Sequence, residues 1–108
     1  MGFYKEPTDC FIEVTNHFVG LEAVLFSYSP GLRDLHIALH KETRYFLIKF
    51  VGVNHVQTST RWVFSKLRIT YEKGKNGGYK ILDQDCLEIV CNNFMVVELL
   101  NGQEVIGI

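Results

Sequence analysis

Two histidines four residues apart, His36 and His40, have a spacing that is common in metal-binding helices. On a helix the two imidazoles would lie one turn apart on the same face, within reach of one zinc ion. The sequence His-Ile-Ala-Leu-His lacks, however, the glutamate that acts as general base in zinc proteases with this spacing. On a strand the two residues would be about 13 Å apart, too far to share an ion. We therefore expect solvent-facing histidines and no metal site.

The three cysteines, Cys10, Cys86 and Cys91, contain no Cys-x-x-Cys pair. Cys86 and Cys91 would point to opposite faces of a continuous strand, which argues against a structural zinc or a redox dithiol. Cys10 beside a histidine would be a thiolate–imidazolium pair, but an inert thiol is the simpler interpretation. The odd number of cysteines and the lack of an Asn-x-Ser/Thr sequence favour a reducing, cytoplasmic location.

Asp83, Asp85 and Glu88 form an acidic cluster next to an expected turn. Two carboxylates two residues apart can bind Mg²⁺ or Ca²⁺, but the calcium-loop spacing and its glycine are missing. Aspartates that stabilise a turn explain the cluster more simply. The glycine-rich segment 74–78 does not match a phosphate-binding loop, and no Gly-x-Ser-x-Gly turn occurs. A metal-dependent enzyme is thus the least favoured function, and we expect no catalytic residue, metal or cofactor.

Four residues at even positions, Trp62, Phe64, Lys66 and Arg68, are the candidate binding residues. On a continuous strand they would project together from one face. Aromatic rings beside cations on a β-face are surfaces on which single-stranded nucleic acids stack and against which acidic proteins or sugars dock. The alternative is that Trp62 and Phe64 cover a second layer of the core or a chain terminus.

The charge of the chain is unevenly distributed along its length. Residues 33–80 carry ten of the eleven Lys and Arg residues against three acids, a net charge of +7, whereas residues 1–32 carry −3 and residues 81–108 carry −5. Either the basic strands pair with the acidic ends, or the fold has one basic and one acidic face. We favour the second outcome slightly, because no acid joins the face of Lys66 and Arg68 before Glu72.

The elements that must position these residues are mainly strands. Residues 35–39 and 45–50 share a period of two across a polar turn, which predicts an antiparallel hairpin. Gly52 indicates a bend where the sheet curls. Apolar residues at odd positions then predict a continuous strand up to Glu72. Its even-numbered face is expected to be exposed, with Lys66, Arg68 and Thr70. Its odd-numbered face is expected to be buried, with Val63, Leu67, Ile69 and Tyr71.

The C-terminal third is expected to finish as a meander. Strands at 79–82, 86–91, 94–100 and 103–108 are separated by turn residues, and the Asn-Gly pairs at 76–77 and 101–102 are typical of tight hairpin turns. The last residues are apolar and should dock in the sheet.

The first third is ambiguous. Residues 11–14 are expected to begin the sheet, residues 17–27 fit a strand or a short helix, and residues 29–34 favour a turn over a helix start.

Composition limits the fold class. With 108 residues, of which 47% are hydrophobic, we expect a single domain over residues 1–108 and no membrane span, since the apolar stretches reach only half of the ~20 residues required. The strand-rich pattern predicts a mainly β fold: an antiparallel sandwich or a rolled, partly open barrel with at most one or two short helices.

The expected function is binding without catalysis. We predict a cytoplasmic protein-interaction module, such as an immunity or regulatory protein, whose partner is another protein or a second copy of the chain. The alternative is a nucleic-acid or small-ligand binder that uses the basic segment 33–80, although a pI near 6.4 weakens this interpretation.

Overall fold

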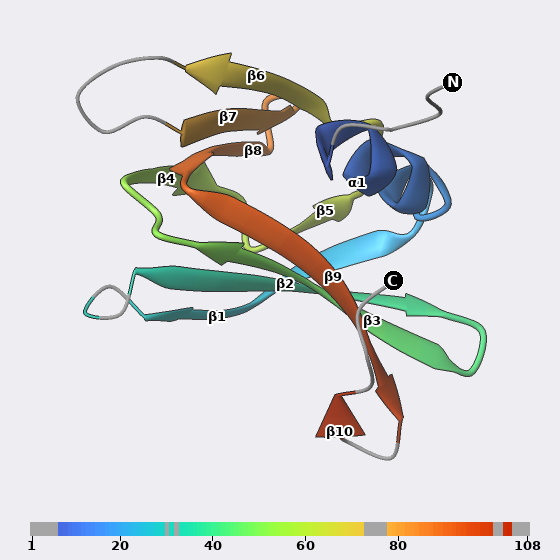
Figure 1. The fold of residues 1–108 in the computed structure, drawn as a ribbon. Helices are drawn as coiled ribbons and strands as arrows, with labels where there is room; N and C mark the ends of the chain where they lie inside the picture. The colour runs from blue at the N-terminus through green and yellow to red at the C-terminus, as the bar shows by residue number, and fades with distance from the viewer. Residues whose placement is uncertain (1–6, 30, 32, 73–77, 101–102, 105–108) are drawn as a thin grey trace, which may run out of the picture.

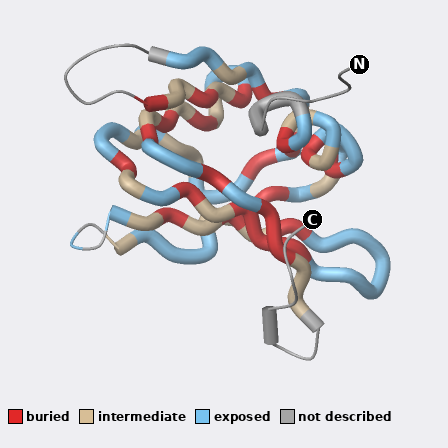
Figure 2. Tube along the Cα trace, in the orientation of Figure 1, coloured by how far each residue is buried: buried red, intermediate tan, exposed pale blue. Residues whose placement is uncertain are grey.

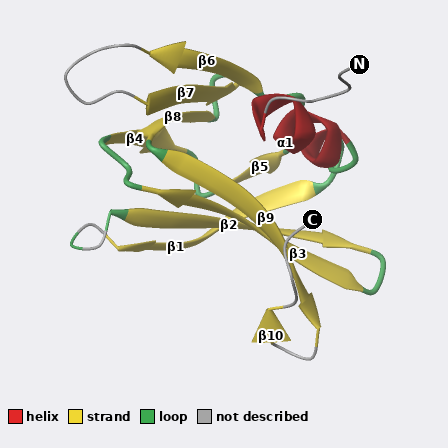
Figure 3. Cartoon of the chain, viewed as in Figure 1, coloured by secondary structure: helices red, strands yellow, loops and turns green. Residues whose placement is uncertain are grey.

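The computed structural model describes residues 7–29, 31, 33–72, 78–100 and 103–104 (Figure 1). Within these residues one helix precedes ten strands, coloured by type in Figure 3. Their order is α1 (Pro7–Asn16), β1 (Glu22–Ser29), β2 (Asp34–Lys41), β3 (Arg44–Val51), β4 (His55–Thr58), β5 (Arg61–Val63), β6 (Arg68–Glu72), β7 (Gly78–Asp83), β8 (Leu87–Cys91), β9 (Asn93–Leu100) and β10 (Gln103–Glu104).

The strands form two antiparallel sheets. Sheet A has the order β10-β9-β3-β2-β1-β5, and sheet B has the order β4-β8-β7-β6. The sheets stack as two layers, and α1 lies beside sheet B above one end of sheet A (Figure 1). Neither sheet closes into a barrel within the described residues. The predicted fold class is therefore confirmed in its open, sandwich-like form.

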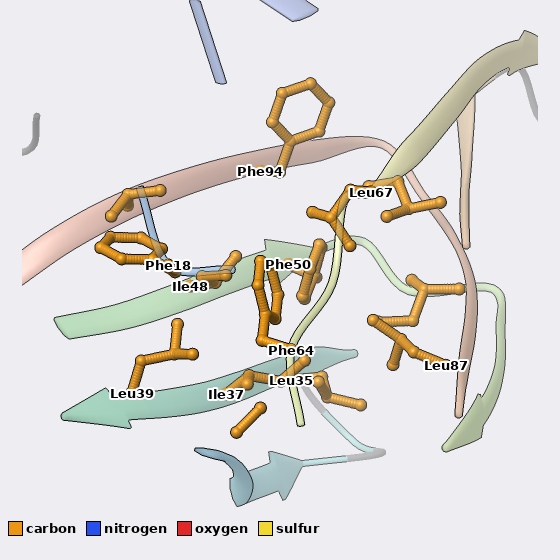
Figure 4. Packing of buried hydrophobic residues seen from close by; sticks show 14 of the residues in the cluster. Phe18, Leu35, Ile37, Leu39, Ile48, Phe50, Phe64, Leu67, Leu87 and Phe94 are labelled. Carbon is orange, nitrogen blue, oxygen red and sulfur yellow. The ribbon is translucent and has the colours of Figure 1, made fainter. Parts of the chain in front are cut away.

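The core fills the space between the sheets, where the buried residues gather (Figures 2 and 4). The radius of gyration of 13.6 Å agrees with the about 13 Å expected for one compact domain of this size. The largest fully buried apolar side chains of the described residues are Leu35, Ile37, Leu39, Ile48, Phe50, Phe64, Ile81, Leu87 and Ile89.

The hairpin predicted over residues 35–50 is confirmed. Strands β2 and β3 pair with Leu35 opposite Phe50 and Ile37 opposite Ile48, so that odd positions of β2 and even positions of β3 share the inner face. The histidines of β2 lie at the alternate positions, on the outer face. The helical zinc-binding arrangement of these histidines is thus not formed.

Gly52 marks the bend where the chain leaves sheet A for sheet B, as its position predicted. Its φ angle is +67°, and a Cβ atom at this position would lie 2.5 Å from Nδ2 of Asn92. Asn92 lies where the chain returns from β8 to β9, and its N–H donates to the carbonyl of Val51. The two connections between the sheets, at Gly52 and at Asn92, therefore lie side by side. Any side chain at position 52 would clash with Asn92 and strain the backbone, so only glycine fits there.

The continuous strand expected over residues 62–72 is wrong. The structure has β5 in sheet A, β6 in sheet B and a connection at 64–67. The buried positions change parity there, from Phe64 to Leu67, because the chain crosses from one layer to the other. Leu67 is buried and Lys66, Arg68 and Thr70 are exposed as expected, and Ile69 is half-buried, whereas Val63 and Tyr71 are exposed.

The first third contains a helix where a strand was expected. Phe11, Thr15 and Phe18 are buried at helical spacing, and the ring of Phe11 lies 4.3 Å from that of Phe94. Residues 11–14 therefore do not begin the sheet, and of the two alternatives for residues 17–27 the strand is correct from Glu22 onward. Gly31 and Arg33 lie in a turn, as favoured for 29–34.

The expected C-terminal meander is only partly formed. Strands β7 and β8 pair in sheet B, and β9 pairs with β10, but after β8 the chain returns to sheet A and β9 pairs with β3. The glycine-rich turn at 73–77, the second Asn-Gly pair and residues 105–108 lie outside the described residues.

Candidate functional site

The four candidate binding residues do not share an exposed face. Trp62 and Phe64 are buried in the core, whereas Lys66 and Arg68 are exposed. The reason is the change of parity between β5 and β6 described above. The alternative interpretation, in which the two aromatic residues belong to the core, is correct, and a role of Lys66 and Arg68 in binding stays a prediction.

Asp83 is a buried structural carboxylate. Its Oδ2 accepts hydrogen bonds from the indole Nε1 of Trp62 at 2.8 Å and from the backbone N–H of Ser65 at 3.2 Å. The hydroxyl of Ser65 donates to Oδ1. These bonds join the end of β7 to the connection between β5 and β6, and they occupy the oxygens that a metal would need.

The other candidate metal ligands are separated. Asp85 is exposed, while Glu88 lies 2.8 Å from Nε2 of His55. No group of three or more His, Cys, Asp or Glu side chains with metal-binding geometry occurs among the described residues. The acidic cluster is thus divided between a core contact, a turn and a surface pair.

The cysteines are three free thiols in different environments. Cys10 is exposed, Cys86 is half-buried and Cys91 is buried. Burial raises the pKa of Cys91 to about 12, so this thiol is protonated at neutral pH and is a poor nucleophile.

Cations of the basic middle segment pair with both acidic ends. Arg44 binds both carboxylate oxygens of Glu98, at 2.8 and 2.9 Å, and lowers the pKa of that carboxyl. Arg61 lies 3.6 Å from Glu22. The slight preference for wholly separate basic and acidic faces is therefore wrong for these two arginines, and the surface charge is mixed around them.

The outer face of sheet B is polar. Its pairing register places Arg68 beside Leu82, and Thr70 beside Lys80. Glu88 and His55 continue the polar surface toward β4. Such a face is well solvated and requires no covering partner.

The outer face of sheet A is apolar by contrast. The register aligns four apolar residues in one row across the sheet, Val24, Ala38, Leu47 and Val97. Leu47 and Val97 are buried, yet they lie outside the core cluster between the sheets. Both faces of β3 and β9 are therefore apolar, as in strands that are covered on both sides.

Most of the exposed large apolar side chains lie on the same outer face as this row. Among the described residues eight such side chains are exposed, and five of them lie on the outer face of sheet A: Phe26, Tyr45, Val51, Val63 and Met95. Val63 and Phe26 are the most exposed, at 66% and 60%. Single exposed apolar residues are ordinary, whereas several on one face make that face a candidate interaction surface.

A groove of about 420 Å³, which we call the outer groove, runs along this face. Val24, Ala38 and Leu47 line its floor. The side chain of Ala38 is smaller than those of its neighbours Val24 and Leu47, so it leaves a hollow between them. Phe26 and Tyr45 stand at its sides, and the ring of Tyr45 is stacked on that of His40 at 4.3 Å.

A β-bulge places Phe26 beside the groove. The register of β1 against β2 shifts between Leu25 and Ser27, so that Phe26 has no partner opposite it. This extra residue re-aims its side chain locally. The sequence contained one signal for the face, the nearly continuous apolar run 45–51, but nothing that revealed the bulge.

A second hollow of about 380 Å³ lies between α1 and the end of the β2–β3 hairpin. Its polar lining is Glu13, His17, Lys41 and Arg44. Arg44 is already bound to Glu98 and lies over the ring of Phe46. With charges of both signs and an engaged arginine, this hollow is a weaker candidate for a specific site.

The comparisons with known proteins give no relative. No protein-family model matches the chain, and no curated protein or solved structure is significantly similar to it. No helix among the described residues is long and apolar enough to cross a membrane.

Proposed function

We propose that this chain is a non-catalytic binding module that docks a protein surface on the outer face of sheet A. The observation that carries the proposal is the cluster of exposed apolar side chains around the outer groove. Leaving these side chains in water is unfavourable, and a covering surface would remove that penalty. The composition also fits, since Phe, Tyr and Met are enriched at protein interfaces.

A binding role agrees with the state of the titratable groups. Asp83 is held by three donors, Glu88 lies against His55, and the Cys91 thiol stays protonated. A catalytic acid, base or nucleophile needs a reactive group in reach of a substrate pocket. These three side chains act in structural contacts instead.

A cytoplasmic location is part of the proposal. Cys10, Cys86 and Cys91 are all free thiols. A reducing compartment preserves thiols in this state, whereas secreted domains of this size commonly form disulfides.

Nucleic-acid binding is a weaker alternative. The aromatic rings that would stack on bases, those of Trp62 and Phe64, are buried, and two arginines of the basic segment are paired with acids. Lys66 and Arg68 remain exposed on the side of sheet B and would be the contacts for phosphates.

A pull-down with three tagged baits tests the proposal. The baits are the unaltered chain, an outer-face double variant (Phe26→Ser, Tyr45→Ser) and a sheet-B double variant (Lys66→Glu, Arg68→Glu). We expect the unaltered chain and the sheet-B variant to retain the same protein from the native source, and the outer-face variant to lose it. Both variants change exposed side chains, so melting curves serve as the folding control.

The opposite pattern would reject the outer face. If the outer-face variant still binds and the sheet-B variant does not, the contact lies on the basic residues. A steep loss of binding with salt would then indicate phosphate contacts and support the nucleic-acid alternative.

A further inference from the structure

We infer that the occupant of the outer face is a second copy of this chain, in a two-fold symmetric dimer. In this dimer Phe26 of each copy enters the outer groove of the other copy. The inference rests on the proposed function, because it uses the same face, and it adds the identity of the partner.

The shape of the face is self-complementary. Phe26 is a projecting apolar side chain, 60% exposed, and the hollow above Ala38 lies next to it on the same two strands. A two-fold axis through the face places Phe26 of each copy opposite the hollow above Ala38 of the other copy. A projection and a hollow side by side on one surface are what an isologous interface requires.

The lining of the outer groove suits a phenyl ring. Apart from Ala38, its floor consists of Val24 and Leu47, and Leu99 lies at the β9 side. The two polar residues of the lining have partners, since Glu22 lies near Arg61 and His40 is stacked on Tyr45. A buried aromatic anchor in an apolar pocket is the usual centre of an energetic hot spot.

The size of the face is that of a small interface. Strands β1, β2, β3 and β9 are each eight residues long. At about 3.3 Å per residue and about 4.8 Å per strand, these four adjacent strands present a rectangle of roughly 26 by 19 Å. This flat area of about 500 Å² is below the about 800 Å² that each partner contributes to a standard interface, and it agrees with a weak dimer.

The charges on the face permit self-association. The acids of this face whose side chains the structure describes are Glu22 and Asp34, and the corresponding bases are Lys49 and Arg61. Glu104 pairs with Leu99 at the edge of the same sheet. Glu22 and Arg61 already lie within 3.6 Å of each other. With a net charge of −1 on the whole chain, two copies meet little long-range repulsion.

Sedimentation velocity of the full chain over a concentration series tests the dimer. The test variant is Phe26→Ser, and the matched control is Tyr71→Ser, since Tyr71 is an aromatic residue on sheet B with a similar exposure of 58%. We expect the unaltered chain and the control to dimerise with the same Kd. Phe26→Ser should raise the Kd at least about tenfold.

A second variant, Ala38→Glu, fills the hollow with a charge and should raise the Kd in the same way. It places a carboxylate on the outer face rather than in the core, so the melting curve reports separately on folding. Normal dimerisation of both Phe26→Ser and Ala38→Glu would overturn the inference, as would a chain that stays monomeric up to about 1 mM.

The two proposals fail in different ways. If the chain is monomeric but the pull-down still captures another protein through Phe26 and Tyr45, the self-association inference is wrong and the proposed function stands. If neither association depends on the outer face, both are wrong.

Discussion

At the scale of single residues, the buried carboxylate of Asp83 has a structural role. Asp83 accepts hydrogen bonds from a core indole and from the backbone and side chain of Ser65. The sequence identified Asp83 as a candidate metal ligand or turn residue, but it could not reveal that Trp62, 21 positions away, donates to it. That contact depends on how the two layers stack, which residue types and spacing do not encode.

Replacement of Asp83 by Ala should therefore destabilise the chain. The substitution leaves the buried indole N–H and the Ser65 donors without acceptors, which costs about 3 kcal/mol of the free energy of unfolding. Urea titration measures this loss. Asp85→Ala is the control, since Asp85 is exposed and its removal should change stability by less than about 0.5 kcal/mol. Equal losses for the two variants would contradict the structural role of Asp83.

At the scale of elements, the sequence predicted the β2–β3 hairpin, the bend at Gly52 and the mainly β class. These features depend on local period and turn chemistry, which are visible in one segment. The helix α1 was missed because the buried residue that follows Phe11 on its face is the polar Thr15, and the next buried residue, Phe18, lies in the turn after the helix. The break between β5 and β6 was missed because residues 62–72 alternate between even and odd positions as one continuous strand would. Only the change of layer after Phe64 reverses which positions are buried.

The outer groove was missed for a related reason. It depends on the bulge at Phe26 and on the register that sets Ala38 between Val24 and Leu47. Register between strands is a property of the assembled sheet, and a shift of one residue would move every side chain to the other face. The run 45–51 was identified from the sequence as a mostly apolar strand, but not as one with apolar residues exposed on its outer face.

The packing of β6 provides a test at this scale. Ile69 is half-buried against the core, whereas Thr70 is exposed on the outer side of sheet B. Ile69→Ala should lower the free energy of unfolding by about 2 kcal/mol, near the lower end of the range for buried apolar residues. Thr70→Ala should have little effect in the same chemical denaturation experiment. Similar losses would mean that the face assignment of β6 is wrong.

At the scale of the whole molecule, the two outer faces are unlike. Sheet B presents Arg68, Thr70 and Lys80 to solvent, whereas sheet A presents an apolar row with exposed aromatic residues beside it. Pairing of Arg44 with Glu98 and of Arg61 with Glu22 mixes the two signs of charge around these arginines, which reduces the charge asymmetry that the sequence suggested. The clearest contrast between the two faces is one of polarity, and the proposed binding surface on sheet A rests on it.

The most direct test of that surface is site-specific photo-cross-linking in the native source. A photoreactive phenylalanine analogue would replace Tyr45 on the outer face or, as the matched control, Tyr71 on sheet B; the two tyrosines are 52% and 58% exposed. We expect a discrete cross-linked protein from position 45, either another protein or a second copy of the chain, and none from position 71. A cross-link from position 71 alone, or the same product from both positions, would contradict the assignment of the outer face of sheet A as the binding surface.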